Sequence, residues 1–271
     1  MNNKNRIKIY EVDTEVVSNN YINNDYKHLI LRAPSKALDI VPGQFFHLQC
    51  PPSDGSISFL RRPMSVYQFN KRENQIEFLY KLHGKGTRAI SNLQKNNIFN
   101  IVGPLGKGFV VEENYKNIVL IARGVGLATL APLANLAFKK GINLTVICSA
   151  RSKEYLMSLD LFNSLSNKVI VVTDNDGSSS MDNLELLINN MMSNQGVDAF
   201  FTCGSNRILK LLKKVCELNN IPGQIALEQQ MACGIGMCFC CVRPFEIGDK
   251  IIQKRVCKEG PVFRVSEALP W

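Results

Sequence analysis

Residues 117–139 read Asn117-Ile-Val-Leu-Ile-Ala-Arg-Gly-Val-Gly-Leu-Ala-Thr-Leu-Ala-Pro-Leu-Ala-Asn-Leu-Ala-Phe-Lys139, and this stretch decides much of the fold. The apolar run over 117–122 is typical of a buried strand, and the glycines at 124 and 126 indicate a tight turn before a helix near 128–139. Strand, glycine turn and helix together form the unit from which helix-covered parallel sheets are built.

The same alternation of strand-like and helical runs continues to about residue 228. The strand-like runs are 144–148, 169–173, 199–203 and 225–227, and the helical runs are 159–165, 182–192 and 207–218. Repeated units of this kind with short links predict a parallel α/β sheet. Ligands bind to such sheets at the carboxyl ends of the strands.

The residues before about 113 have a different pattern. Short runs with apolar residues at alternate positions are separated by glycine and proline turns, at 7–12, 28–32, 44–48, 64–67 and 75–82. This spacing predicts an antiparallel β-barrel, with one short helix at 88–93.

The residues after about 228 are rich in cysteine and lack clear periodicity, so we expect something other than a hydrophobic core to hold them together. The sequence thus predicts a multi-domain chain. Its parts are a β-barrel domain at 1–113, an α/β parallel-sheet domain at 114–226 and a small C-terminal lobe at 227–271.

Composition and charge narrow the function classes. The formal net charge is +9, but the basic residues are scattered, so we expect no nucleic-acid partner. The apolar stretch 118–138 contains Arg123 and Pro132, which argues against a membrane span of about 20 apolar residues. Residues 1–8 show no apolar leader, and nine unevenly placed cysteines do not suit a disulfide framework. We therefore expect a reducing, cytoplasmic location.

The strongest motif is Cys233-x4-Cys238-x2-Cys241, followed after fifteen residues by Cys257. This is the spacing of plant-type [2Fe–2S] sites, in which four thiolates are shared between two irons. A zinc site and bare structural thiols are the alternatives, but zinc sites favour paired C-x2-C knuckles. Cys240 adjoins Cys241, and we expect it to pack rather than to ligate, with ligation as the alternative.

Two further motifs lie in the β-rich part. Arg61-Arg-Pro-Met-Ser-Val-Tyr67 offers an arginine that can clamp a diphosphate and a serine that can hydrogen-bond a flavin ring nitrogen. Leu79-Tyr-Lys-Leu-His-Gly-Lys-Gly-Thr-Arg-Ala-Ile90 offers freed backbone amides at the start of a short helix. Each motif alone is most often structural, but their order and spacing together are specific.

With these motifs, Gly103-Pro-Leu-Gly-Lys-Gly-Phe109, Cys203-Gly204 and the four C-terminal cysteines, the chain resembles the ferredoxin–NADP reductase superfamily. The segments 227–236 and 255–263 more narrowly resemble electron transfer subunits of bacterial dihydroorotate dehydrogenases. The resemblance covers nearly the whole chain.

The resemblance implies FAD in the first domain and a [2Fe–2S] cluster on Cys233, Cys238, Cys241 and Cys257. It implies that FAD is held by Arg62, Pro63, Met64, Ser65, Leu79, Tyr80, Lys81, Gly86 and Thr87. We expect Arg62 to hold the diphosphate and Ser65 to face the isoalloxazine. Tyr80 could stack on the flavin or be an aromatic residue of the barrel.

The middle domain is then expected to bind NAD or NADP through Gly124, Gly126 and Cys203. Arg123 stands where the superfamily commonly has a glycine, and it could reach a phosphate or block the pocket. Asp174 could touch a ribose or belong to a loop that caps the next helix. Arg151 could bind a 2′-phosphate or lie free on the surface.

These assignments predict an oxidoreductase subunit that moves electrons between a nicotinamide and a partner protein. A flavin-binding (β/α)₈ barrel alone needs about 250 residues, so the organic substrate must react on another chain. By resemblance, the partner is an FMN-containing dihydroorotate dehydrogenase catalytic subunit, in pyrimidine biosynthesis. A reductase that serves ferredoxin or another flavoenzyme, and a redox-sensing module without nicotinamide activity, are the alternatives. We interpret His28 and His47 as structural, and His83 as structural or near the flavin.

Overall fold

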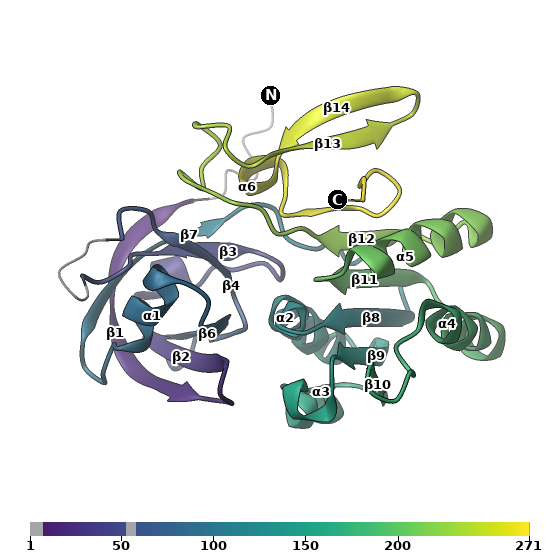
Figure 1. The fold of residues 1–271 in the computed structure, drawn as a ribbon, viewed down its shortest axis with the longest axis horizontal. Coiled ribbons are helices and arrows are strands. Elements are labelled where there is room, and N and C mark those ends of the chain that lie inside the picture. Colours follow the sequence, from purple (N-terminus) through teal and green to yellow (C-terminus); the bar gives the residue numbers. More distant parts are fainter. Residues whose placement is uncertain (1–7, 53–57, 271) are drawn as a thin grey trace.

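The N-terminal strands form a seven-stranded antiparallel sheet that curls around its own core (Figure 1). The structure, a computed structural model, describes residues 8–52 and 58–270. The strands pair in the order β4-β3-β7-β1-β2-β6-β5. Their bounds are β1 Tyr10–Tyr21, β2 Tyr26–Arg32, β3 Phe45–Leu48, β4 Arg62–Ser65, β5 Gln68–Asn70, β6 Gln75–Lys81 and β7 Ile98–Leu105. The short helices η1 (Ser35–Ala37) and α1 (Lys85–Ser91) accompany the sheet.

The core of this sheet follows from the two-residue alternation of its strands. Phe46 of β3 and Phe78 of β6 are fully buried, with ring centroids 6.0 Å apart in an edge-to-face arrangement. The predicted antiparallel barrel is thus confirmed as a curled sheet, with β4 and β5 as its two edges. The expected first strand begins at Tyr10, and Ile7 lies outside the described residues.

The middle of the chain forms a six-stranded sheet in the order β10-β9-β8-β11-β12-β15. The strands are β8 (Asn117–Arg123), β9 (Asn143–Ala150), β10 (Lys168–Thr173), β11 (Ala199–Cys203), β12 (Gly223–Ala226) and β15 (Val262–Arg264), and the first five are parallel. The helices are α2 (Gly126–Lys139), η2 (Lys153–Tyr155), α3 (Leu159–Leu165), α4 (Met181–Gln195) and α5 (Asn206–Asn219). The predicted α/β unit is therefore present.

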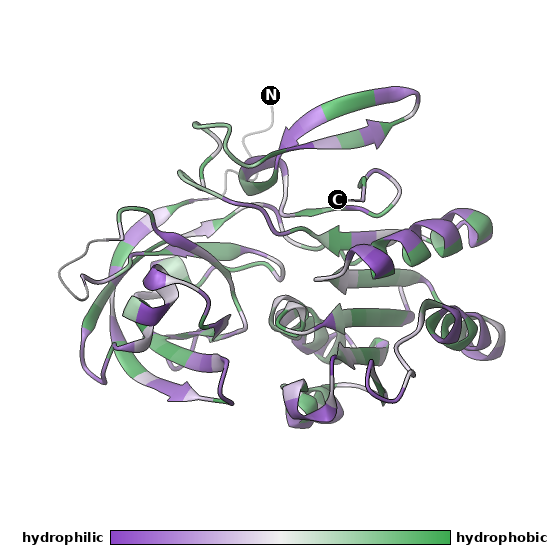
Figure 2. Ribbon diagram, in the orientation of Figure 1, coloured by the Kyte–Doolittle hydropathy of each residue, from purple (hydrophilic) through white to green (hydrophobic). Residues whose placement is uncertain are grey.

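The helices cover both faces of this sheet. Alternate strand residues such as Val119 and Ile121 pack toward α4 and α5, while Ile118 and Leu120 pack toward α2 and α3. Figure 2 shows apolar residues along the central strands and polar residues on the outer sides of the helices. None of the helices in the described ranges is long and apolar enough to cross a membrane.

The order of the strands reverses between β8 and β11. The chain moves outward from β8 through β9 to β10, then returns to place β11 on the other side of β8. Such a reversal leaves a crevice at the carboxyl ends of the two strands, where open α/β sheets bind their ligands.

The C-terminal segment contains a hairpin of β13 (Val242–Ile247) and β14 (Lys250–Arg255), then α6 (Val256–Glu259) and β15. β15 pairs antiparallel with β12, and Phe263 packs on the fully buried Phe245 with ring centroids 4.2 Å apart. Both rings join the apolar cluster that α4 and α5 form on the sheet. The expectation that this segment is held by something other than a core is therefore wrong for residues 242–268, because their apolar side chains extend the core of the α/β sheet.

Candidate functional site

Arg62 and Gly86, both predicted to bind FAD, lie against each other. A Cβ built on Gly86 would meet the Arg62 guanidinium at 2.6 Å, so the guanidinium rests on the first turn of α1. Arg62 donates to the carbonyl of Leu60 at 2.5 Å and to Ser58 Oγ at 3.0 Å. No carboxylate among residues 8–52 and 58–270 pairs with it. A cation held by neutral groups beside a glycine fits a diphosphate.

Thr87 shapes the same turn. Its Oγ1 accepts hydrogen bonds from the backbone N–H groups of His83 at 2.9 Å and Gly84 at 3.1 Å. The hydroxyl also donates to the carbonyl of Gly84 at 3.1 Å. These three hydrogen bonds hold the first turn of α1 in place. They therefore keep Gly86, which lies in that turn, beside Arg62.

The predicted FAD residues of β4 point to two different faces. Ser65 lies opposite Phe45 of β3, and Pro63 lies opposite His47. Directly opposed residues of an antiparallel pair share a face, so Pro63 and Ser65 lie on the outer face of the sheet. Met64 lies opposite Phe46 and is buried with it in the core.

β6 is not a hydrogen-bonded neighbour of β4, but the two strands contact each other across the curl of the sheet. The three predicted FAD residues of β6 differ in where their side chains lie. Tyr80 is only 3% exposed inside the curled sheet, and its hydroxyl donates to Asn19 Oδ1 at 2.9 Å. Burial raises the pKa of this phenol. This is the position expected of a barrel aromatic. Leu79 faces the opposite side, toward α2, and Lys81 is exposed.

The cysteine loop turns its backbone N–H groups toward sulfur. Met237 and Cys238 donate to Cys233 Sγ at 3.3 Å and 3.4 Å. Burial opposes ionisation of the Cys233 thiol, but the backbone N–H groups of Cys238 and Ile235 outweigh it and lower its pKa to about 6. The turn requires left-handed backbone at Gly234 (φ +70°), which a glycine adopts without strain. The loop thus suits an anionic sulfur centre.

The fourth predicted ligand approaches this loop from α6. Cys257 N–H donates to Cys241 Sγ at 3.4 Å, and both residues are 2% exposed. Burial and the neighbouring Cys241 raise the pKa of Cys257 to about 12, so an iron ligand there requires the metal to displace the proton. Cys238 and Cys240 are exposed, and none of the nine cysteines forms a disulfide.

No three His, Cys, Asp or Glu side chains within the described ranges converge on a single-ion site. A two-iron cluster makes a different demand, because each iron takes only two of the four protein thiolates. The sulfur-directed N–H groups and the free thiols fit such a cluster.

Arg255 connects the cysteine loop, which carries Cys233, Cys238 and Cys241, to α6, which carries Cys257. Its guanidinium donates to the carbonyl of Gly236 at 2.8 Å and pairs with Glu259 at 2.5 Å. It also lies 4.8 Å from the ring centroid of Phe239. No motif in the sequence predicts a role for Arg255, although its position two residues before Cys257 is a usable signal.

His47 is a second residue whose role the sequence did not reveal. It is 1% exposed, and its Nε2 has no hydrogen-bond partner among the residues that the structure describes. A Cβ built on Gly234 would lie 2.7 Å from this nitrogen. Burial and the charge of Arg61 lower the pKa of His47 to about 4, so the ring is neutral near pH 7. The imidazole thus stands between β4 and the cysteine loop.

The residues expected to bind a nicotinamide meet at the crevice between β8 and β11. A Cβ on Gly126 would lie 2.6 Å from the carbonyl oxygen of Cys203, so only glycine allows this approach. Gly124 has φ +57° in the turn after β8. Cys203 is 1% exposed, and burial raises its pKa to about 12. The structure therefore brings Gly124, Gly126 and Cys203 together.

Arg123 lies across the carboxyl ends of three neighbouring strands. It donates to Ser149 Oγ at 3.0 Å and pairs with Asp174 at 2.5 Å. Hydrogen bonds from Arg123 and Ser179 lower the pKa of Asp174 to about 2. Asp174 thus holds the Arg123 side chain in place. Arg151, the other arginine considered for a phosphate contact, is exposed. The nearby Asp176 accepts from the N–H of Ser178 at 3.0 Å, as a loop cap does.

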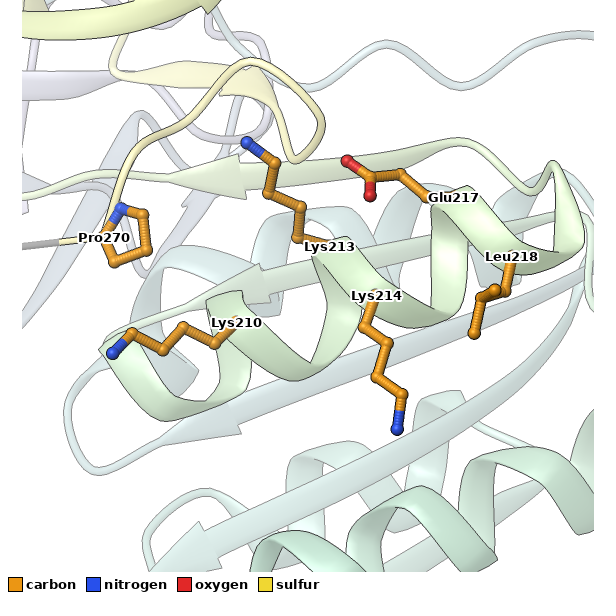
Figure 3. Close-up of a pocket in the computed structure, with 6 residues that line it drawn as sticks. All are labelled: Lys210, Lys213, Lys214, Glu217, Leu218 and Pro270. Atoms are coloured by element: carbon orange, nitrogen blue, oxygen red, sulfur yellow. The ribbon is translucent and has the colours of Figure 1, made fainter.

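A cavity of about 570 Å³ lies apart from these sites, along α5 (Figure 3). It is lined by Lys210, Lys213, Lys214, Glu217, Leu218 and Pro270. The lysine side chains point in different directions, and two are already paired, Lys213 with Glu246 at 2.7 Å and Lys214 with Glu185 at 2.6 Å. We assign no function to it.

Two family profiles match the chain. Residues 13–109 match the oxidoreductase FAD-binding domain, and residues 228–268 match the iron-sulfur cluster binding domain of dihydroorotate dehydrogenase B. The first covers β4, and the second covers the four predicted cluster ligands.

Curated proteins are similar over most of their length. The dihydroorotate dehydrogenase B (NAD(+)) electron transfer subunit of Caldanaerobacter subterraneus subsp. tengcongensis is 34% identical over 228 residues, which are 84% of this chain and 87% of that protein. The subunit of the same name from Listeria monocytogenes is 30% identical over 262 residues, 95% of this chain and 98% of that protein.

Solved structures agree on the fold. The structure reported for NADH-dependent reduced ferredoxin-NADP oxidoreductase has a TM-score of 0.78 and 28% identity, covering 94% of this chain and 88% of that chain. Ferredoxin-NADP+ reductase from Plasmodium falciparum, 13% identical, shares the fold with a TM-score of 0.61 over 77% of this chain and 90% of that chain. The curled sheet, the α/β sheet, the cysteine lobe and these similarities lead to one conclusion: the chain belongs to the family of dihydroorotate dehydrogenase B (NAD(+)) electron transfer subunits.

Proposed function

We propose that this chain is the electron-transfer subunit of a dihydroorotate dehydrogenase, carrying electrons from a partner flavoenzyme to NAD in the pathway that makes pyrimidines. When bound, FAD exchanges two electrons with a nicotinamide and single electrons with a [2Fe–2S] cluster. The partner is an FMN-containing catalytic subunit on which dihydroorotate is oxidised to orotate. We place the complex in the cytoplasm.

One observation carries this proposal: the outer face of β3 and β4, which includes the predicted flavin residue Ser65, meets the cysteine loop. Ser65 is the cross-strand neighbour of Phe45, and Phe45 packs in one apolar cluster with Cys241 and Cys257. On the same face, His47 joins Pro63 of β4 to Gly234 of the loop. Two redox groups held here would be next to each other, as electron transfer requires.

The chain's own groups have distinct roles in this proposal. Arg62 binds the FAD diphosphate over Gly86, and Ser65 hydrogen-bonds the isoalloxazine ring. Backbone N–H groups of the cysteine loop stabilise the thiolate of Cys233. The proposed domains are the FAD part at 1–113, the NAD part at 114–226 and the cluster lobe at 227–271. β15 connects the last two parts directly.

The proposed nicotinamide site is the crevice between β8 and β11. Gly124 and Gly126 let the backbone approach a dinucleotide, and Cys203 lies at the adjoining strand end. The pairing of Arg123 with Asp174 favours a structural role for this arginine at the rim of the crevice. We propose NAD as the cofactor because the curated relatives carry it in their names.

Purification with candidate partners tests the function. An anaerobic complex with an FMN-containing dihydroorotate dehydrogenase subunit should reduce NAD when dihydroorotate is added, and orotate should form in equal amount. The isolated chain should show flavin and iron–sulfur absorption, and NADH should bleach the flavin. A chain that is free of iron after anaerobic preparation, or one that binds no such partner, contradicts the proposal.

The FAD clamp has its own test in a pair of neighbouring arginines. Arg62→Ala should weaken FAD binding by roughly 10- to 100-fold, as expected for a hydrogen-bonded charge. Arg61→Ala is the matched control, because Arg61 pairs with Glu11 at 2.8 Å instead of facing Gly86. Equal FAD affinity in both variants, measured by ultrafiltration and fluorescence, would place the diphosphate elsewhere.

A second candidate is a subunit that links a nicotinamide to ferredoxin. The structural similarity to a ferredoxin-NADP oxidoreductase over nearly the whole chain supports this second candidate. The two candidates differ in the partner that restores turnover. Activity with reduced ferredoxin and none with a dihydroorotate dehydrogenase subunit selects the second. Failure of both NADH and NADPH to bleach the flavin would instead indicate a redox-sensing module.

A further inference from the structure

Two glycine-containing segments that are far apart in the sequence, residues 103–109 and 255–263, meet in the structure. The N–H of Lys107 donates to the carbonyl of Gly260 at 2.5 Å, and Lys107 forms a parallel bridge with Pro261. The first segment contains the end of β7, and the second contains the fourth predicted cluster ligand. A backbone hydrogen bond therefore joins the curled sheet to the segment that completes the cysteine site.

Gly106 allows the two segments to approach this closely. A Cβ built on Gly106 would lie 2.5 Å from Cδ of Pro261 and 2.6 Å from the carbonyl oxygen of Gly260. The backbone at Gly106 has φ +75°, which a glycine adopts without strain. The same Cβ would lie 3.0 Å from Cε1 of Phe45. Gly106 thus contacts the cluster lobe on one side and β3 on the other.

Phe45 connects this contact to the proposed flavin site, because it is the cross-strand neighbour of Ser65 on β4. The buried Gln44 next to Phe45 donates from Nε2 to the carbonyl of Gly106 at 2.9 Å. Its Oε1 accepts from the N–H of Val41 at 2.8 Å, so both ends of the amide are held. The turn at Gly106 is therefore fixed to the strand beside the predicted flavin residue.

The α/β sheet holds the other side of the C-terminal segment. The carbonyl of Pro261 accepts from the N–H of Leu227 at 2.9 Å, and β15 then pairs with β12. A Cβ built on Gly43 would lie 2.9 Å from Cγ2 of Val262, so the curled sheet also packs closely on the start of β15. Figure 1 shows the C-terminal segment above both sheets. The segment is thus held between them.

We propose that residues 106–107 and 260–262, which we call the joint, set the distance between the proposed flavin and the [2Fe–2S] cluster. This rests on the proposed function, which supplies both groups, and it makes Gly106 a positioning residue. In the step concerned, one electron leaves the reduced cluster and enters the flavin, so that the cluster is oxidised and the flavin reduced by one electron. No bond in the joint forms or breaks. The rate of such a transfer falls steeply with distance.

Gly106→Ala tests the joint in the full chain with FAD and cluster. The added Cβ has to displace Pro261 from 2.5 Å to the 3.4 Å at which ordinary contact begins. The distance between cluster and flavin should therefore increase by a similar amount. Pulsed electron paramagnetic resonance of the half-reduced protein should show this as a weaker magnetic coupling between the two groups. Stopped-flow measurement should show slower electron transfer, with FAD and iron contents unchanged.

Gly248→Ala is the matched control. Gly248 has φ +58° in the turn between β13 and β14, and a Cβ built there would meet no atom within 4 Å. The control variant therefore adds a comparable backbone strain to the cluster lobe without displacing the joint, and its coupling and rate should equal those of the wild type. A loss of stability alone would not change the coupling, so this readout separates positioning from a merely structural role.

Val262→Ala is a second variant, one that introduces no clash. It removes the Cγ2 methyl group that packs on Gly43, so the joint should loosen. The distribution of cluster–flavin distances should be narrow in the wild type and broader in this variant. This comparison decides the matter if Gly106→Ala does not fold or loses a cofactor.

The inference is overturned if Gly106→Ala keeps both cofactors and its magnetic coupling is unchanged, or if Gly248→Ala weakens the coupling as much. A broad distance distribution in the wild type also overturns it. Where Gly106→Ala cannot be measured, an unchanged distribution in Val262→Ala has the same meaning. A wild-type chain without FAD or iron is a different result, because it rejects the proposed function itself.

Discussion

The α/β sheet and the cysteine loop keep their shapes by different means. The sheet buries apolar side chains on both faces, so that its stability is spread over dozens of contacts. The loop at 233–241 depends on left-handed backbone, sulfur-directed N–H groups and the single guanidinium of Arg255, and its Met237 and Phe239 side chains are exposed. The sheet should therefore tolerate many substitutions with gradual losses of stability, whereas a few substitutions should be enough to disrupt the loop.

The largest expected effect tests the loop. Cys238→Ser should abolish cluster absorption and reduce bound iron to near zero, because one iron loses a thiolate, while flavin absorption remains. Cys240→Ser is the matched control, since Cys240 is also exposed but lies outside the proposed ligand set. Visible spectra with iron and sulfide analysis measure both. A full cluster in the Cys238 variant, or its loss in the Cys240 variant, would require a different ligand set.

The next prediction tests the sheet. Phe200→Ala should lower the free energy of unfolding by about 3–5 kcal/mol, because Phe200 is fully buried in β11 and its removal leaves a cavity. Phe138→Ala on α2 is the control, because Phe138 is 58% exposed and should change stability by about 0.5 kcal/mol or less. Denaturant unfolding measures both. If the cluster is lost before the sheet unfolds in the Phe200 variant, the two regions are not independent.

A smaller effect is expected from a change at Arg255, which connects the cysteine loop to α6. Arg255→Met should speed the release of iron to a chelator by roughly 10-fold, since the carbonyl of Gly236 and the carboxylate of Glu259 lose a charged hydrogen-bond donor. Lys250→Met, on the same hairpin and exposed, should release iron at the wild-type rate. Equal rates in both variants would show that the loop does not depend on Arg255.

The smallest effect concerns the rim of the sheet. The pKa of Asp174 is about 2 against an ordinary 3.8, so its ion pair stabilises the fold fully above pH 3.8 and is lost as the pH falls through about 2. Arg123→Gln should raise this pKa toward 3.8 and reduce the loss of stability between those two pH values. Carboxyl-carbon NMR titration measures the pKa. An unchanged value would mean that Ser179 and Arg207 hold the carboxylate without Arg123.

The sequence was most informative where structure is local. The helix at 159–165 and the strand at 199–203 occur with the predicted bounds, because an apolar period identifies each of them without distant partners. The cysteine spacing is equally local. Arg62 and Gly86, predicted to share one site, do lie against each other.

Long-range pairing was beyond the sequence. The three residues of β15 form a strand only because β12 offers them an edge, and no period in so short a run can reveal that. His47 was interpreted as structural because nothing near it indicates that the outer face of β3 meets a loop at residue 234. Tyr80 shows the same limit, since alternation alone does not say which face of β6 is the interior.

The pairing of β15 with β12 has a consequence for the behaviour of the chain in concentrated solution. An uncovered β12 would present a row of free backbone groups to other molecules, and such edges promote self-association. β15 shields that row, and it follows directly after the segment that carries Cys257. Detachment of this tail would therefore create an adhesive strand edge, so that solubility depends on a short strand that follows closely after the proposed cluster ligand Cys257.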